Sequence, residues 1–127
     1  MQYAVPRRGL PGPVSFRRWA SGFGELTLRI VGRREGIRLN RRYRGRNKPT
    51  NVLTFDTGDI VLCHPVIRDE ARRQGKSLDA HYAHLVVHGA LHWRGFDHMT
   101  KKQAARMERE EIRRLRRLGF ADPYTVE

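Results

Sequence analysis

The hydrophobic positions along the chain predict three short strands. Residues 25–31 alternate between polar and apolar side chains, with leucine or isoleucine at every second position after Glu25. This period of two is typical of a strand that buries one face. Residues 51–55 and 59–63 form two further strand-like runs joined by a turn around Gly58. Because the connection is so short, these two runs are expected to pair as a hairpin.

A helical period dominates most of the remaining sequence. Three shorter helices are predicted over residues 14–20, 35–44 and 65–74. A fourth begins after Ser77 or Asp79, either of which can cap it, and runs to about His92. A fifth opens with the capping box Thr100-x-x-Gln103 and runs to Leu118. The fourth helix contains the apolar run 85–87, so we expect it to be the central buried helix.

The order of these elements predicts an α+β fold, in which a small mixed sheet is covered by packed helices. A length of 127 residues fits one domain. We therefore expect residues 1–127 to form a single domain, in which residues 1–24 are a short basic N-terminal part. The central helix carries the histidines discussed below.

Positive charge is concentrated in the first part of the chain. The sequence has 26 Lys and Arg residues against 13 Asp and Glu residues, which gives a formal net charge of +13. Residues 1–50 hold 13 of the basic residues and only Glu25 and Glu35 as acids. Such a charge attracts polyanions, and the planar arginine side chain suits phosphate oxygens. Composition therefore favours contact with nucleic acid over an anionic membrane, for which a basic helix would need a continuous apolar stripe.

Composition also indicates the cellular setting. Cys63 is the one cysteine, so no intramolecular disulfide can form. No apolar run approaches the ~18–20 residues that a membrane helix needs. Residues 1–13 lack the apolar segment of a signal peptide. We therefore expect a cytoplasmic protein without a membrane partner.

Three histidines at the end of the central helix form the most informative motif. His88 and His92 are four residues apart, so on a helix they lie on one face with Cβ atoms ~5–6 Å apart. Gly95 allows the chain to turn out of the helix, and His98 can return to the same point. Three histidines at this spacing predict a site for one metal ion with an open coordination position, which is typical of catalytic zinc.

The same spacing occurs in the metzincin proteases, whose pattern is H-E-x-x-H-x-x-G-x-x-H. Those enzymes need a glutamate directly after the first histidine as general base. Gly89 occupies that position here and offers no carboxylate. Peptide hydrolysis by that mechanism is therefore not expected. A metal ion that supplies hydroxide or polarises a phosphoryl oxygen remains consistent with the motif.

Residues 88–98, which read HGALHWRGFDH, resemble the H-G-x-L-H-x-x-G-x-D-H signature of the YbeY family of bacterial endoribonucleases. Residues 39–53 resemble the family's second signature, which contains a Y-R-G element, and the resemblance covers about residues 25–124. It implies that His88, His92 and His98 bind one zinc ion and that Arg44 takes part in catalysis. It also implies single-strand-specific cleavage in maturation of the 16S rRNA 3′ end and in ribosome quality control. The implied partners are rRNA, the small ribosomal subunit and its assembly factors.

Further residues near these motifs have expected roles in RNA binding and in orienting the metal ligands. Four basic residues are expected to hold the RNA backbone without reading its sequence: Arg41, Arg42, Arg46 and Lys48. Asp97 is expected to orient one ligand imidazole through a hydrogen bond. Its alternative role is to cap the turn before His98.

Two other functions remain open from the sequence. One is a non-catalytic ribosome-associated protein with a structural zinc ion, which needs a fourth ligand such as Cys63 or His64. The other is a metal-dependent hydrolase of a small ester or amide. Its activity would not depend on ionic strength in the way that cleavage of a polyanion does.

Overall fold

The computed structural model describes residues 1–125 and contains a four-stranded mixed sheet. Its strands are β1 (Gln2–Tyr3), β2 (Thr27–Val31), β3 (Val52–Thr54) and β4 (Asp59–Cys63), in the sheet order β1-β2-β4-β3. Strands β1 and β4 run parallel to β2, whereas β3 pairs antiparallel with β4. The predicted hairpin and the α+β class are confirmed.

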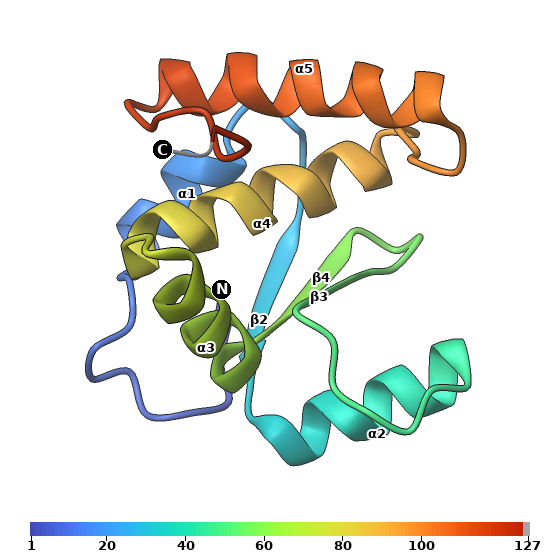
Figure 1. Cartoon of the computed structure of the whole chain (residues 1–127). Helices are drawn as coiled ribbons and strands as arrows, with labels where there is room; N and C mark the ends of the chain where they lie inside the picture. Colours follow the sequence, from blue (N-terminus) through green and yellow to red (C-terminus); the bar gives the residue numbers. More distant parts are fainter. Residues whose placement is uncertain (126–127) are drawn as a thin grey trace.

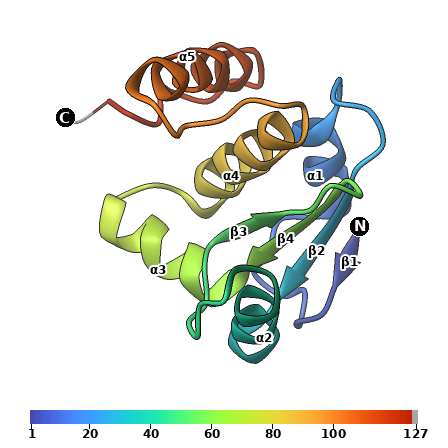
Figure 2. The ribbon, with the colours of Figure 1, turned by 90° about the vertical axis from the view of Figure 1, so that its right-hand side faces the viewer.

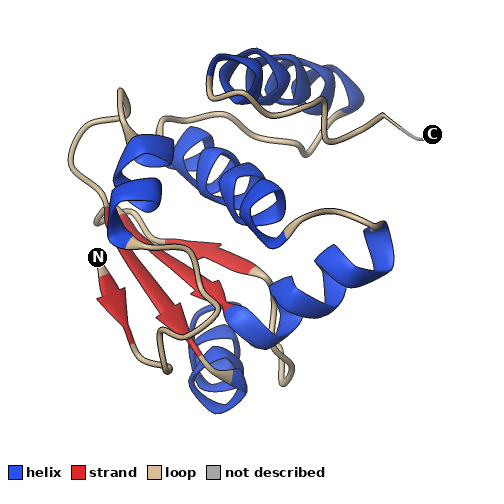
Figure 3. Cartoon of the chain, turned by 90° about the vertical axis from the view of Figure 1, so that its left-hand side faces the viewer, coloured by secondary structure: helices blue, strands red, loops and turns tan. Residues whose placement is uncertain are grey.

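Helices cover both faces of this sheet. The described chain contains α1 (Pro13–Ala20), α2 (Arg33–Arg44), α3 (His64–Gln74), α4 (Leu78–Trp93) and α5 (Lys101–Arg117). Helix α4 lies between the sheet and α5, while α2 lies on the opposite face of the sheet (Figure 1, Figure 2). Figure 3 shows α1 beside α4 on the same side of the strands. No helix within residues 1–125 is long and apolar enough to cross a lipid bilayer.

Strand β4 is buried on both faces because its alternate side chains enter two different cores. Ile60 and Leu62 join the main core, which also contains the apolar residues of α1 and α4. Val61 and Cys63 join a smaller cluster that packs against Leu39 of α2. This alternation is the pattern of a central strand with helices on both sides.

The sequence pattern does not predict β1. This strand has only two residues, which is too short to show a period. Only its pairing with β2 makes it a strand, with Gln2 opposite Arg29 and Tyr3 opposite Ile30. The predicted strand over residues 25–31 begins at Thr27, where the pairing with β4 starts.

Local signals place the ends of the helices that carry the site. The Ser77 side chain accepts a hydrogen bond from the backbone N–H of Ala80, so Ser77 is the cap of α4. The capping box of Thr100 and Gln103 is present at the start of α5. These contacts lie within a few residues of one another, which is why the sequence predicts them.

Helix α4 approaches the sheet closely at Gly89. A Cβ atom added there would lie 3.0 Å from Thr54 Oγ1 and 3.1 Å from Ile60 Cγ2. The Thr54 hydroxyl also donates a hydrogen bond of 3.1 Å to the Gly89 carbonyl. Position 89 therefore faces the strands, where the glutamate of the protease pattern would not fit.

Larger residues at position 89 are expected to destabilise the fold. Gly89→Ala gains up to ~1 kcal/mol of helix propensity, but the added methyl group meets atoms at 3.0–3.3 Å and such overpacking costs about 1–3 kcal/mol. A net loss of up to ~2.5 kcal/mol is expected. Gly89→Glu also buries a carboxylate and is expected to lose more than ~4 kcal/mol.

The free energy of unfolding in urea measures both changes. Gly12→Ala controls for the added methyl group without crowding, because no atom lies within 4 Å of a Cβ added there; since Gly12 caps α1, it is expected to lose no more than ~1 kcal/mol. Wild-type stability of Gly89→Glu would contradict the close approach of α4 to the sheet.

Candidate functional site

Helix α4 and the loop after it bring three histidines together. His88 and His92 lie one turn apart on α4, and His98 follows in the loop before α5. The ring centroids are 5.3 Å apart for His88 and His92, and 4.9 Å apart for His92 and His98. One nitrogen of each ring lies within 4.8 Å of the others. Nitrogens this close can converge on one metal ion by small side-chain rotations.

The loop that returns His98 to the helix depends on two residues. Gly95 has a φ of 101°, in the region that favours glycine, and its N–H donates a 3.0 Å hydrogen bond to the His92 carbonyl. The Asp97 carboxylate accepts a 2.7 Å hydrogen bond from the backbone N–H of His98. Asp97 therefore caps this turn, while its expected contact with a ligand imidazole stays a prediction.

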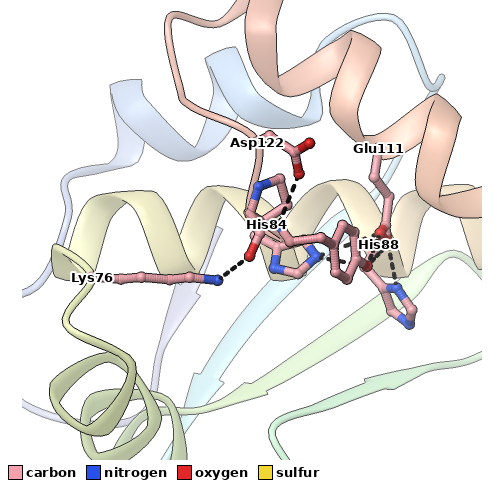
Figure 4. Close-up of polar contacts among 7 residues, drawn as sticks. Lys76, His84, His88, Glu111 and Asp122 are labelled. Atoms are coloured by element: carbon pink, nitrogen blue, oxygen red, sulfur yellow. Dashed lines mark hydrogen bonds and ion pairs between the residues drawn. The ribbon is translucent and has the colours of Figure 1, made fainter. Parts of the chain in front are cut away.

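Glu111 of α5 is a buried partner of His88. One carboxylate oxygen lies 2.8 Å from His88 Nδ1, and the other accepts a 2.6 Å hydrogen bond from the Tyr124 hydroxyl. His84 Nε2 lies 3.4 Å from the same carboxylate. Figure 4 shows His84 and His88 converging on Glu111. Because the carboxylate accepts from Nδ1–H, the lone pair of His88 Nε2 is left for a metal ion.

The surroundings favour the ionisation states that metal binding requires. Burial lowers the pKa of His92, and the charges of the neighbouring histidines lower it further. Burial by itself would raise the pKa of Glu111, but hydrogen bonds from two histidines and Tyr124 lower it to about 2. At neutral pH, His92 is therefore neutral and Glu111 carries a negative charge.

Sequence reasoning missed Glu111, although a signal was present. Met107, Glu111 and Leu115 recur at every fourth position of α5, and all three are buried. A carboxylate on the buried face of a helix needs a polar partner. The spacing along the chain does not reveal that partner, because His88 and Tyr124 come from other segments.

Arg44 and the three histidines line one cleft of 480 Å³. Arg44 is the last residue of α2, which ends at Gly45 with a φ of 68°. Strand β3 contributes residues 52–54 to the cleft. The positive charge of Arg44 adds to the burial and the neighbouring histidines that lower the pKa of His92. The arginine and the histidines therefore meet although their helices lie on opposite faces of the sheet.

A second cleft of 440 Å³ adjoins the first and shares Arg44, Thr50 and Asn51 with it. Arg46 and Lys48 line this second cleft. Arg41 and Arg42 are exposed on α2 and line neither of the two clefts. Of the four expected RNA-binding residues, Arg46 and Lys48 therefore lie next to the cleft with the histidines, and the other two lie outside both clefts.

Cys63 and His64 lie apart from the histidine group. The Cys63 sulfur is buried against α2, only 2.9 Å from where a Cβ on Gly36 would lie. His64 Nδ1 lies 2.8 Å from the Tyr82 hydroxyl. Within the described part of the chain, the group holds three ligand residues and neither of these two belongs to it.

Comparison with known proteins places the chain in a family. The family described as "Endoribonuclease YbeY" matches residues 14–119. A protein of that name from Stenotrophomonas maltophilia (strain R551-3) is 45% identical over the whole chain and 92% of its own length. One from Nitrosomonas eutropha is also 45% identical, over the whole chain and 98% of its length.

A solution structure of a Thermotoga maritima protein shares the fold. Its TM-score is 0.51 at 21% sequence identity, covering 89% of this chain and 88% of that one. At this identity the likeness concerns the fold alone, whereas the family match covers most of the sequence, including the histidine motif and Arg44. The chain therefore belongs to the YbeY endoribonuclease family.

Proposed function

We propose that this endoribonuclease depends on zinc and cleaves single-stranded RNA. The observation that carries the proposal is the single cleft lined by Arg44 and three histidines. Imidazole nitrogens suit zinc, and three protein ligands leave one position open for water or substrate. Held by these histidines, zinc would supply the chemistry of a Lewis acid toward a phosphoryl oxygen or water.

The residues of the cleft have three different roles: binding the ion, positioning its ligands and stabilising the phosphate. His88, His92 and His98 hold the ion, and Glu111 keeps the ring of His88 in the orientation that presents Nε2. The Arg44 guanidinium donates hydrogen bonds to the scissile phosphate and stabilises the negative charge that develops on its oxygens. Asp97 keeps His98 in reach by capping its turn.

The basic residues beyond the cleft bind the backbone of the RNA on either side of the cut. Arg46 and Lys48 line the adjoining cleft, and Arg41 and Arg42 extend the positive surface along α2. These side chains contact phosphates and do not read sequence. A net charge of +13 supports a polyanionic substrate.

We further propose that the substrate is the 3′ end of 16S rRNA, in maturation and ribosome quality control in the cytoplasm. The small ribosomal subunit and its assembly factors are the proposed partners. Support comes from the resemblance of residues 88–98 and 39–53 to the two family signatures. The positive surface around Arg44 is also consistent with a site on rRNA.

The two alternatives have weaker support. A structural zinc protein normally has four protein ligands, but Cys63 and His64 contact other residues. A hydrolase of a small ester or amide has no use for a second cleft lined by Arg46 and Lys48 beside the first. Both observations favour RNA cleavage.

Removing the metal is expected to abolish cleavage of a labelled single-stranded RNA, and added zinc to restore it. His92→Ala, which removes a ligand, is expected to remain inactive after zinc is added.

Arg44→Ala removes a hydrogen-bond donor to the charge that develops on the phosphate oxygens and is expected to lower the cleavage rate about 10²–10³-fold. Arg44→Lys keeps the charge without the planar fork and should fall between Arg44→Ala and wild type.

Initial rates on one RNA measure these effects. The variants, purified in the same way, control for traces of host nucleases. Cleavage that survives both chelation and the two alanine substitutions would rule out this mechanism.

Cleavage is also expected to weaken steeply as salt increases. Each phosphate contact to single-stranded RNA contributes about −0.7 to the slope of log affinity against log salt. Replacing both Arg46 and Lys48 by alanine should therefore make the slope less negative by about 1.4. This slope is measured from KM for the RNA across a series of salt concentrations. A KM that does not change with salt would favour the small-molecule hydrolase.

Loss of Glu111 is expected to weaken zinc binding. Glu111→Ala frees the ring of His88 and should lower zinc affinity about 10–100-fold, the usual effect of losing such an outer partner. Competition with a chromophoric chelator measures the affinity without depending on activity. Glu108→Gln is the control, since Glu108 is exposed on the same helix.

The thermal unfolding of each metal-free variant shows whether it is folded. A folded Glu111→Ala protein with wild-type zinc affinity would contradict the role of Glu111 in positioning His88.

A further inference from the structure

Two aromatic rings, one exposed and one partly buried, lie in contact at the edge of the cleft that contains the three histidines. Tyr43, in the last turn of α2, is 57% exposed. Its ring centroid is 4.6 Å from that of Phe55, with the ring planes at 68°. Phe55 itself lines the cleft that contains the three histidines. Residues 43 and 55 thus form one apolar surface that continues from the cleft to solvent.

This pair rests on a rigid base. Phe55 packs against the smaller core cluster, which includes Leu53 and Val61, and its backbone N–H donates a 2.9 Å hydrogen bond to the Asp59 carbonyl. Tyr43 is held by α2, whose end is set by Gly45. The Tyr43 ring is therefore fixed in position but not buried in the core. Its exposed face is available to a ligand.

Two arginines beside the aromatic pair indicate a negatively charged ligand. The guanidinium carbon of Arg42 lies 5.8 Å from the centroid of the Tyr43 ring, and Arg44, next in sequence, lines the cleft. Aromatic rings beside guanidinium groups bind an unstacked base together with its phosphate. An acidic partner protein would form ion pairs with the arginines, but its carboxylates would not bind the exposed aromatic face.

We propose that Tyr43 and Phe55 form a stacking site for an unpaired RNA base next to the scissile phosphate. This inference rests on the proposed function and deepens it, because stacking requires a base whose face is accessible. Bases in a duplex are stacked on one another and cannot enter the site. The preference for single strands therefore arises from Tyr43 and Phe55, whereas the arginines bind phosphate in either form.

The test measures binding of a fluorescent, uncleavable 2′-O-methyl single-stranded RNA by anisotropy. Tyr43→Ala is expected to weaken binding about 5- to 150-fold, the range for loss of one base–aromatic stack. Tyr43→Phe keeps the ring and should restore the affinity. Tyr43→Leu keeps an apolar side chain without a ring and should bind as weakly as Tyr43→Ala. Val14→Ala, at an exposed apolar residue of α1, should bind like wild type.

Two further measurements separate stacking from charge. Tyr43→Ala should leave the salt dependence of binding unchanged, whereas Arg42→Ala should make its slope less negative by about 0.7. An oligonucleotide with abasic sugars throughout should bind equally to wild type and Tyr43→Ala. A change in the salt slope of Tyr43→Ala, or a loss of abasic binding, would assign Tyr43 to phosphate contact and overturn the proposal.

Wild-type cleavage of single-stranded RNA, measured in parallel, keeps the two proposals distinct. If wild type neither binds nor cleaves the RNA, the proposed function fails. If wild type cleaves and Tyr43→Ala binds and cleaves equally well, the stacking site is wrong and the proposed function stands.

Discussion

The close approach of α4 to strands β3 and β4 is the constraint on which the site depends. At Gly89 the helix backbone is near enough to accept a hydrogen bond from the Thr54 side chain, and a Cβ atom there would lie only 3.0 Å from the Thr54 hydroxyl oxygen. The approach aligns His88 and His92 with the edge strand, so that β3 forms the wall of the metal cleft. A larger side chain would push helix and strand apart and widen the cleft that the histidines line.

His88 is held from the side opposite the sheet by Glu111 of α5. Glu111 bonds to His88 and is itself held by Tyr124 and approached by His84. A carboxylate with all of these partners can remain charged while buried, which is costly otherwise. Because the partners come from α4, α5 and the C-terminal segment, the position of the His88 ring depends on the packing of all three.

The two faces of the sheet contribute different chemistry to one cleft. Helix α4 supplies imidazoles that could hold a metal ion, and α2, on the other face, supplies positive charge through Arg44 and an exposed ring through Tyr43. The cleft therefore combines side chains from both faces at one edge of the sheet.

The sequence by itself determined the features that depend on near neighbours. The hairpin, the capping box and the spacing of His88, His92 and His98 involve contacts over a few residues, so a local pattern contains them. It also indicated Arg44 through its family motif, but the placement of Arg44 in the cleft required α2 to pack beneath the sheet. Tertiary structure alone decided that Glu111 supports His88 and that Tyr43 meets Phe55. These contacts join segments far apart in the chain, and their partners are chosen by packing, which spacing along the sequence does not record.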